Sequence, residues 1–274
     1  MHYMLVDLND KNILGESPIW NNHYQSFFWV DIEDYKIKKY NEKDLIEVFP
    51  TSLKPTCIAN YNNNLVIVLE KGVGIYDFRD KNSVKMLIDK NWDQNIRFND
   101  GKCDRNGNLY FGSMSLDEPR KNNGKIYKLN KNLQLDEIIG GIHVSNGISF
   151  SVDNSKMYYS DTPQETIYQL YNHENINDSN KSIFYKVNGR PDGSTVDCLD
   201  NYYSCLWDGF GIEVIGSNPS FIETNKRFTT CCSFGGKDLD KLFITSAYNN
   251  DKDNGSPVIK DMKINGILEA DVSI

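Results

Sequence analysis

Short runs of alternating apolar and polar residues recur along the whole chain. Each run begins with an aromatic or β-branched segment, continues through a polar turn, and ends in a second alternating segment such as GKIYKLN. Alternation with a period of two is typical of strands that are buried on one face. No segment shows a sustained apolar period of 3.6 residues, so the pattern predicts an all-β protein.

The runs recur at similar intervals. Six of them begin at Phe27, Leu65, Leu109, Met157, Tyr202 and Leu242, so that successive starts are 38 to 48 residues apart. Clusters of Asn, Asp and Gly precede nearly every run and favour tight hairpins, because these residues tolerate a positive φ. Units of about 43 residues with three or four strands are typical of the blades of a β-propeller. The sequence therefore predicts a single six-bladed β-propeller domain over residues 1–274. A two-sheet sandwich also has many short strands, but it is not expected to keep a repeat length along the chain.

A propeller ring must also close on itself. The N-terminal segment HYMLVDLN (residues 2–9) has the composition of a strand. We expect it to pair with a strand from the C-terminal end, because closure of this kind leaves no open gap in the ring.

Composition and charge narrow the classes of function. The chain has 30 Lys and Arg residues against 38 Asp and Glu, a formal net charge of −8, which argues against nucleic-acid binding. No stretch approaches the ~20 apolar residues of a membrane span, and no basic leader precedes an apolar block as in a secretory signal. None of the six cysteines forms C-x-x-C. We therefore predict a cytoplasmic protein with reduced cysteines that binds neither nucleic acid nor membrane. The sequence does not indicate its oligomeric state.

Four polar residues share one phase of the repeat. Glu16, Asn99, Asn146 and Asp192 each lie 10 or 11 residues before the start of a run, where the innermost strand of a blade should begin. Equal phase in a propeller means equal height in the central channel, so we expect these side chains to converge from four blades. Asn-Gly and Asp-Gly are also ordinary turn signals, which is the alternative interpretation of three of these positions.

Two carboxylates and two amides form a set of oxygen donors. Such donors suit a hard divalent cation such as Ca²⁺, Mg²⁺ or Mn²⁺. Zn²⁺ is a further candidate, although it usually prefers His or Cys, and the four histidines of this chain form no H-E-x-x-H motif. We expect one divalent metal ion, Ca²⁺, Zn²⁺, Mn²⁺ or Mg²⁺, in the channel.

The strings around these positions carry a resemblance. LGESPIW with WVDI, RFNDGKCD with YFGSM, SNGISFS, and RPDGSTVD stand in this order from about residue 14 onward. In order and spacing they resemble the SMP-30/gluconolactonase/regucalcin family over nearly the whole chain, up to about residue 272. The resemblance implies a six-bladed propeller with a single catalytic divalent metal in its channel, and an activity on sugar lactones.

The resemblance also implies roles for particular residues. Glu16, Asn146 and Asp192 would be the metal ligands, and Arg97 and Asn99 would contact the substrate. An acidic residue after the G-[ST]-M segment would also contact the substrate, and here it is either Asp117 or Glu118. Asp192 is in addition the candidate catalytic residue, because a carboxylate can accept a proton from an attacking water.

The sequence thus predicts a metal-dependent lactonase, in which a metal-activated water attacks the carbonyl of a small-molecule sugar lactone and opens the ring to the sugar acid. Two alternatives stay open. One is a hydrolase of non-sugar lactones or esters on the same scaffold, and the other is a non-enzymatic Ca²⁺-binding propeller. We expect loops 115–124 and 249–256 to select among substrates.

Overall fold

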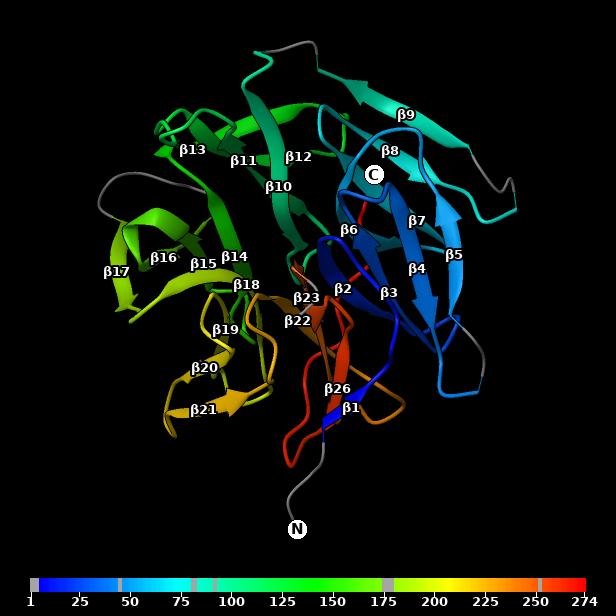
Figure 1. Ribbon diagram of the computed structural model, residues 1–274. Helices are drawn as coiled ribbons and strands as arrows, with labels where there is room; N and C mark the ends of the chain where they lie inside the picture. The colour runs from blue at the N-terminus through cyan, green and yellow to red at the C-terminus, as the bar shows by residue number, and fades with distance from the viewer. Residues whose placement is uncertain (1–4, 44–45, 80–82, 91–92, 174–179, 251–252) are drawn as a thin grey trace.

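The chain folds into a ring of β-sheets. The computed structural model describes residues 5–43, 46–79, 83–90, 93–173, 180–250 and 253–274. Within these residues there are six four-stranded antiparallel sheets, which follow one another around a common centre (Figure 1). The predicted all-β, six-bladed β-propeller is confirmed.

The six sheets are the blades, numbered here in chain order. Blade 1 comprises β2 (Gly15–Asn21), β3 (Ser26–Asp31), β4 (Lys36–Tyr40) and β5 (Glu47–Pro50). Blade 2 comprises β6 (Pro55–Tyr61), β7 (Asn64–Leu69), β8 (Gly72–Tyr76) and β9 (Val84–Asp89). Blade 3 comprises β10 (Ile96–Cys103), β11 (Leu109–Ser115), β12 (Gly124–Leu129) and β13 (Leu135–Ile142). Blade 4 comprises β14 (Ser145–Phe150), β15 (Lys156–Asp161), β16 (Thr166–Tyr171) and β17 (Lys181–Lys186). Blade 5 comprises β18 (Arg190–Val196), β19 (Tyr202–Trp207), β20 (Gly211–Ile215) and β21 (Ser220–Glu223).

Blade 6 closes the ring with both ends of the chain. It comprises β22 (Thr229–Gly235), β23 (Lys241–Ser246), β26 (Val258–Asp261) and β1 (Leu5–Asp7). Strand β1 pairs antiparallel with β26, with Leu5 opposite Lys260 and Asp7 opposite Val258 (Figure 1). The predicted pairing of the N-terminal segment is confirmed for these residues, while residues 2–4 lie outside the described chain. A short ribbon of β24 (Tyr248–Asn249) and β25 (Asp253–Asn254) stands beside blade 6.

The starts of all six sequence runs lie in the second strands of the blades. These strands are almost completely buried, as in β3, whose residues are all buried, because a blade in a ring is covered by a neighbour on each face. The outermost strands are more exposed: β17 has no buried residue. Alternation therefore marks the outer strands of a blade, whereas the second strands appear as continuous apolar runs.

The hydrophobic core is divided among the junctions between blades. The described residues form six clusters of buried side chains, and each cluster joins two neighbouring blades. At the junction of blades 6 and 1, the ring of Phe27 stacks on that of Phe243 at 4.7 Å, and Trp29 is completely buried. Complete burial of one such side chain contributes about 1.5–3 kcal/mol. The ring is thus held together by side-chain packing at every junction, and its centre is free for polar groups.

The two ends of the ring differ. The upper end is defined here as the end where the first strands of the blades begin, and the lower end as the end of the hairpins that join the first and second strands. In blade 3 the Asp104 carboxylate accepts hydrogen bonds from the backbone N–H groups of Asn106 and Asn108, each at 2.9 Å. Asp197 forms the equivalent bonds in blade 5. Such Asp-centred turns fix the lower hairpins.

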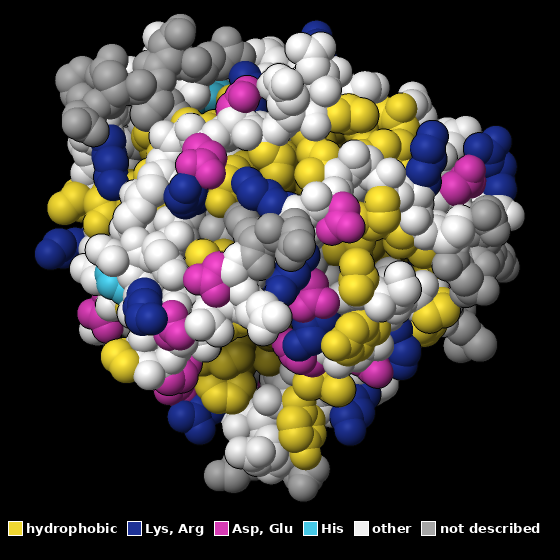
Figure 2. Space-filling model, turned by 90° about the horizontal axis from the view of Figure 1, so that it is seen from above, with side chains coloured by type: hydrophobic (Ala, Val, Ile, Leu, Met, Phe, Trp, Pro, Cys, Tyr) yellow, Lys and Arg dark blue, Asp and Glu magenta, His cyan; other side chains and the backbone are white. Residues whose placement is uncertain are grey.

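The described residues contain no helix that is long and apolar enough to cross a membrane. A 3₁₀ turn, η1 (Thr162–Gln164), follows β15. On the face shown in Figure 2, Lys and Arg side chains are interspersed with Asp and Glu side chains and do not form one large patch.

Candidate active site in the channel

Every first strand is irregular near its upper end. The pairing with the second strand skips forward at the same height in all six blades, in the manner of a β-bulge. The skips fall between Glu16 and Ile19, Pro55 and Cys57, Phe98 and Gly101, Asn146 and Ser149, Pro191 and Ser194, and Thr229 and Cys232. A bulge bends its strand and redirects side chains. Each of the four polar residues that share one phase of the sequence lies in such a bulge or directly beside it.

The four residues line one cavity. Glu16 of blade 1, Asn99 of blade 3, Asn146 of blade 4 and Asp192 of blade 5 all border a space of ≈ 400 Å³ at the upper end of the channel. Arg97 of blade 3 borders the same space. Asn99, Asn146 and Asp192 are buried, with 8%, 5% and 5% of their surface exposed. The structure therefore brings together five of the seven residues singled out in the sequence.

A chain of hydrogen bonds links three blades across this cavity. Arg97 Nη1 donates to Asn99 Oδ1 at 2.7 Å, and Asn99 Nδ2 donates to Asn146 Oδ1, also at 2.7 Å. Asn146 Nδ2 donates to Thr162 Oγ1 at 2.9 Å, and this hydroxyl donates to the carbonyl of Pro191 at 2.7 Å. The chain fixes both amide orientations, so that Asn146 presents its oxygen on the side of Asn99.

The protein environment disfavours the ionised forms of the Glu16 and Asp192 carboxylates. Burial raises the pKa of Glu16 well above its usual range, and the charges of Asp192 and Asp100 add to this effect. Burial also raises the pKa of Asp192 well above its usual range, again with a contribution from Asp100. The Arg97 guanidinium acts in the opposite direction on both groups. Buried anions that repel one another require a compensating positive charge if both are to stay ionised at neutral pH.

The donor set fits a divalent cation. Glu16 and Asp192 supply carboxylate oxygens and Asn146 supplies an amide oxygen, which are the ligand types of hard cations. Among the described residues there is no group of three or more His, Cys, Asp and Glu side chains arranged to hold a metal. The third donor here is an amide, and three protein donors leave positions free for water and substrate.

Loop 115–124 contributes different residues from those expected. Leu116 and Arg120 border the cavity, whereas Asp117 and Glu118 are not among the residues that line it. Asp117 forms an ion pair with Lys121 at 3.1 Å, and the Glu118 side chain is 74% exposed beside Arg120. Arg120 Nη1 donates to the Ser115 carbonyl at 2.9 Å, which holds its guanidinium at the rim. None of the described residues of 249–256 borders the cavity.

Sequence reasoning missed several cavity residues. Arg190 lies two positions before Asp192, and Trp207 lies opposite Arg190 on β19. Arg190 and Trp207 both line the cavity. Glu33 and Lys54 form an ion pair of 2.6 Å at the same rim. Their positions relative to the channel follow from the register of second strands and connecting loops. The only available signal was the position of Arg190 in the RPDG string.

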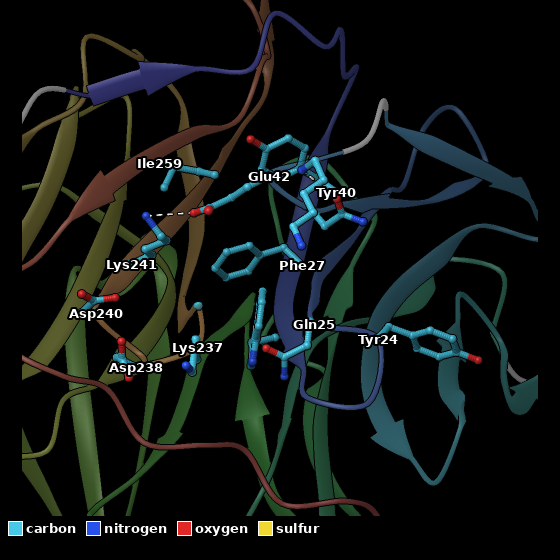
Figure 3. A pocket seen from close by; sticks show the side chains of 14 residues that line it. Tyr24, Gln25, Phe27, Tyr40, Glu42, Lys237, Asp238, Asp240, Lys241 and Ile259 are labelled. Atoms are coloured by element: carbon cyan, nitrogen blue, oxygen red, sulfur yellow. Dashed lines mark hydrogen bonds and ion pairs between the residues drawn. The ribbon is translucent and has the colours of Figure 1, made fainter.

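A second cavity, of ≈ 570 Å³, lies away from this chemistry at the junction of blades 1 and 6. Figure 3 shows the Phe27 ring in its centre and the ion pair between Lys241 and Glu42 beside it, with a distance of 2.9 Å. Trp20 and Ile259 also line it. Its walls are part of the packing that closes the ring, and none of the four converging polar residues reaches it.

The fold and the site define the class of protein: a six-bladed propeller with carboxylates and amides in its channel. Comparison with known proteins identifies the family. Residues 14–248 match the model of the SMP-30/Gluconolactonase/LRE-like region, and the chain belongs to this family. It is 29% identical to regucalcin of Danio rerio over 88% of this chain and 85% of the relative. It is 26% identical to 6-deoxy-6-sulfogluconolactonase of Pseudomonas putida over 89% of this chain and 86% of the relative. The solved regucalcin of Agrobacterium tumefaciens shares the fold, with a TM-score of 0.89 and 19% identity over 99% of this chain and 98% of that one.

Proposed function

We propose that the protein is a lactonase that opens a sugar lactone to the sugar acid and depends on one divalent cation held by Glu16, Asn146 and Asp192. The observation that carries this proposal is the convergence of Glu16 and Asp192, from blades 1 and 5, on one cavity that is also lined by Asn146. Membership of a family with relatives named as lactonases supports the substrate class.

The chain's own residues divide the work of hydrolysis. Water adds through its oxygen to the lactone carbonyl carbon, the bond from this carbon to the ring oxygen breaks, and the ring oxygen takes up a proton to become a hydroxyl group. Asp192 accepts the proton that the attacking water loses and returns it to the leaving oxygen. The cation, when bound, supplies a Lewis acid for the carbonyl and lowers the pKa of a water molecule.

Substrate orientation falls to the hydrogen-bonded pair of Arg97 and Asn99. Nη1 of the Arg97 guanidinium donates to both Asn99 Oδ1 and the Phe98 carbonyl, and the N–H groups of its other two nitrogens are available for sugar hydroxyls. The Asn99 amide is fixed by its bonds to the Ser145 carbonyl and Asn146. A fixed donor array suits a polyhydroxylated substrate better than an aliphatic one, because buried polar groups left without partners cost free energy.

The test is a metal-replacement assay. The protein is dialysed against EDTA and its metal content is measured; Ca²⁺, Mn²⁺, Mg²⁺ or Zn²⁺ is then added singly. Acid release from five- and six-carbon sugar lactones and from aliphatic lactones is followed, with the uncatalysed rate subtracted. We expect no turnover in the metal-free protein and restored turnover of sugar lactones with at least one cation.

Other outcomes would replace the proposal. Full turnover by protein shown to be metal-free would remove the cation from the mechanism. Turnover of aliphatic lactones or esters alone would make the protein a hydrolase of another substrate class. Cation binding without turnover of any lactone would indicate a cation-binding protein that is not an enzyme. The name of the regucalcin relatives is consistent with such a role.

A further inference from the structure

The last residues of the chain cross the lower end of the ring. Residues 264–274, called here the C-terminal strap, contain no strand, but their backbone bonds to four blades. The Asn265 carbonyl accepts a bond from Cys198 N (3.0 Å) in the lower hairpin of blade 5, and Gly266 N donates to the Leu239 carbonyl (2.8 Å) of blade 6. Farther on, the strap reaches the other side of the ring.

There, Val272 N donates to the Asn60 carbonyl of blade 2, and Ser273 N donates to the Gly107 carbonyl of blade 3, both at 2.8 Å. Val272 is 4% exposed and packs into the cluster between blades 2 and 3. Gly107 has a φ of +84°, and a Cβ added there would lie 2.4 Å from Ser273 Oγ. The strap is thus fixed at both ends over the lower mouth of the channel.

Between these ends, the strap places one carboxylate under the ring. Glu269 Oε1 lies 2.9 Å from Nζ of Lys102, and the side chains are only 11% and 8% exposed. Lys102 is on β10, the first strand of blade 3, which also carries Arg97 and Asn99. Burial is the largest single effect on the pKa of Lys102 and lowers it, but the charge and hydrogen bond of Glu269, together with the charges of Cys231 and Asp100, raise that pKa above its usual value. Lys102 is therefore a buried cation whose ion-pair partner comes from the strap.

One carboxylate separates Lys102 from the candidate metal ligands. Asp100 lies two residues before Lys102 on β10, is 6% exposed, and accepts a 3.0 Å hydrogen bond from the Ile148 N–H of blade 4. The Asp100 charge raises the pKa of both Glu16 and Asp192. The Lys102 charge acts to lower the pKa of Asp100, against the larger effect of burial. Asp100 is thus attracted to Lys102 on one side and repelled by Glu16 and Asp192 on the other, so it connects the Glu269–Lys102 ion pair electrostatically with the candidate metal ligands.

We propose that Glu269 is a positioning residue for cation binding: the strap carries it under the channel to neutralise Lys102, so that the upper site keeps the negative potential that attracts a divalent cation. The inference rests on the proposed function. An unpaired ammonium in a buried channel repels a cation more strongly than it would in water, because the interior screens charges weakly. With Glu269 in place, Lys102 is one half of a pair and its field at the upper site is reduced.

Two substitutions distinguish this role from simple support of the fold. Glu269→Gln leaves Lys102 charged and unpaired, and Lys102→Met leaves Glu269 unpaired; both break the same buried ion pair, and both should lower the melting temperature of the metal-free protein. Their effects on cation affinity should have opposite signs. We expect Glu269→Gln to weaken the binding of Mn²⁺ or Ca²⁺ roughly tenfold, and Lys102→Met to strengthen it.

Affinity is measured by calorimetric titration of metal-free protein with MnCl₂ or CaCl₂ alone. The control is Asp271→Asn, which alters an exposed strap carboxylate that accepts a 3.0 Å hydrogen bond from the Asn62 backbone N–H and should leave affinity unchanged. Weaker binding in both pair variants, or unchanged affinity in Glu269→Gln, would overturn the inference. If Lys102→Met does not fold, the comparison of Glu269→Gln with Asp271→Asn decides alone. A wild-type protein that binds neither cation would instead refute the proposed function.

Discussion

The side-chain amide of Asn99 donates a 2.7 Å hydrogen bond to Oδ1 of Asn146, and so joins blade 3 to blade 4 at the height of the two buried carboxylates. Asn99 donates a second bond, of 2.9 Å, to the carbonyl of Ser145. Asn99 therefore orients a candidate metal ligand in addition to its proposed contact with the substrate. The two functions can be separated experimentally.

Asn99→Ala removes both hydrogen bonds and leaves the Asn146 side chain with its bond to Thr162 Oγ1 but without the bond to its oxygen. We expect kcat/KM for a sugar lactone to fall about 10- to 100-fold, and cation affinity to fall as well, because outer contacts orient metal ligands. Steady-state kinetics and calorimetry on the same preparation measure the two effects. If only KM rises and cation affinity is unchanged, Asn99 acts on the substrate alone.

Glu16→Gln removes one of two carboxylates of the cavity whose charges repel each other. The metal-free variant should therefore be more stable than the wild type, by about 1 kcal/mol, although it loses cation binding and activity. Urea unfolding in EDTA provides the measurement. The matched control is Glu33→Gln, since Glu33 borders the same cavity but is paired with Lys54 at the rim; it should change neither quantity much. A destabilised, cation-binding Glu16→Gln protein would contradict the proposed site.

The metal-free protein should lose stability as the pH rises from about 4 to 6. Burial raises the pKa of Asp100 from 3.8 to about 6, so that in this range the folded state holds a proton that the unfolded chain has lost. The contribution is present below the unfolded pKa and is lost as the pH rises through the folded pKa. A change of this size corresponds to roughly 3 kcal/mol. Urea unfolding in EDTA at pH 4.5 and 7 tests the sign. Asp100→Asn should reduce the difference but not remove it, because the pKa values of Glu16 and Asp192 are raised as well.

Cation should stabilise the protein more at pH 7 than at pH 5. Protons and cation compete for the carboxylates of Glu16 and Asp192, whose pKa values are both raised. A cation at about 100 times its Kd stabilises the folded state by about 2.7 kcal/mol. The shift in melting temperature on addition of cation, measured at both pH values, is the readout. An equal shift at both would mean that the cation binds at groups that do not titrate in this range.

Gly193→Ala tests the fit between blades 5 and 6. A Cβ at this position would lie 2.3 Å from Cys231 Sγ and 2.9 Å from Cys231 Cα. Because one of these atoms is backbone, rotation of the thiol cannot relieve the contact, and we expect a loss of about 1–3 kcal/mol. Activity should also fall, since Asp192 is the preceding residue. Gly140→Ala is the control, because a Cβ added there meets nothing within 4 Å.

The propeller ring could be predicted from the sequence, whereas the side-chain contacts across the ring could not. The recurring runs predicted the second strands, and the shared phase of Glu16, Asn146 and Asp192 predicted residues that line one cavity, because both follow from the repeat itself. The closing pair of β1 and β26 was predicted from the need to close a ring. These features depend on local period and on topology, which a single sequence records.

Other features depend on contacts between segments with unrelated patterns. Glu269 and Lys102 are separated by 167 residues, and no pattern in the sequence around either residue indicates that the two form a pair. Loop 115–124 was expected to contribute Asp117 or Glu118, yet Leu116 and Arg120 border the cavity. The direction of a loop side chain depends on the packing of the whole loop, which the alternation of polar and apolar residues does not encode.

The polar side chains that line the channel at the bulges, Glu16, Asn99, Asn146 and Asp192, are not members of the hydrophobic clusters at the blade junctions. A substitution at one of them changes the lining of the channel while the aromatic and aliphatic clusters between the blades keep their contacts. Substrate preference can therefore change in evolution while the fold is retained. A few substitutions in the lining of the channel can alter which molecules bind, and the packing between the blades does not have to change with them.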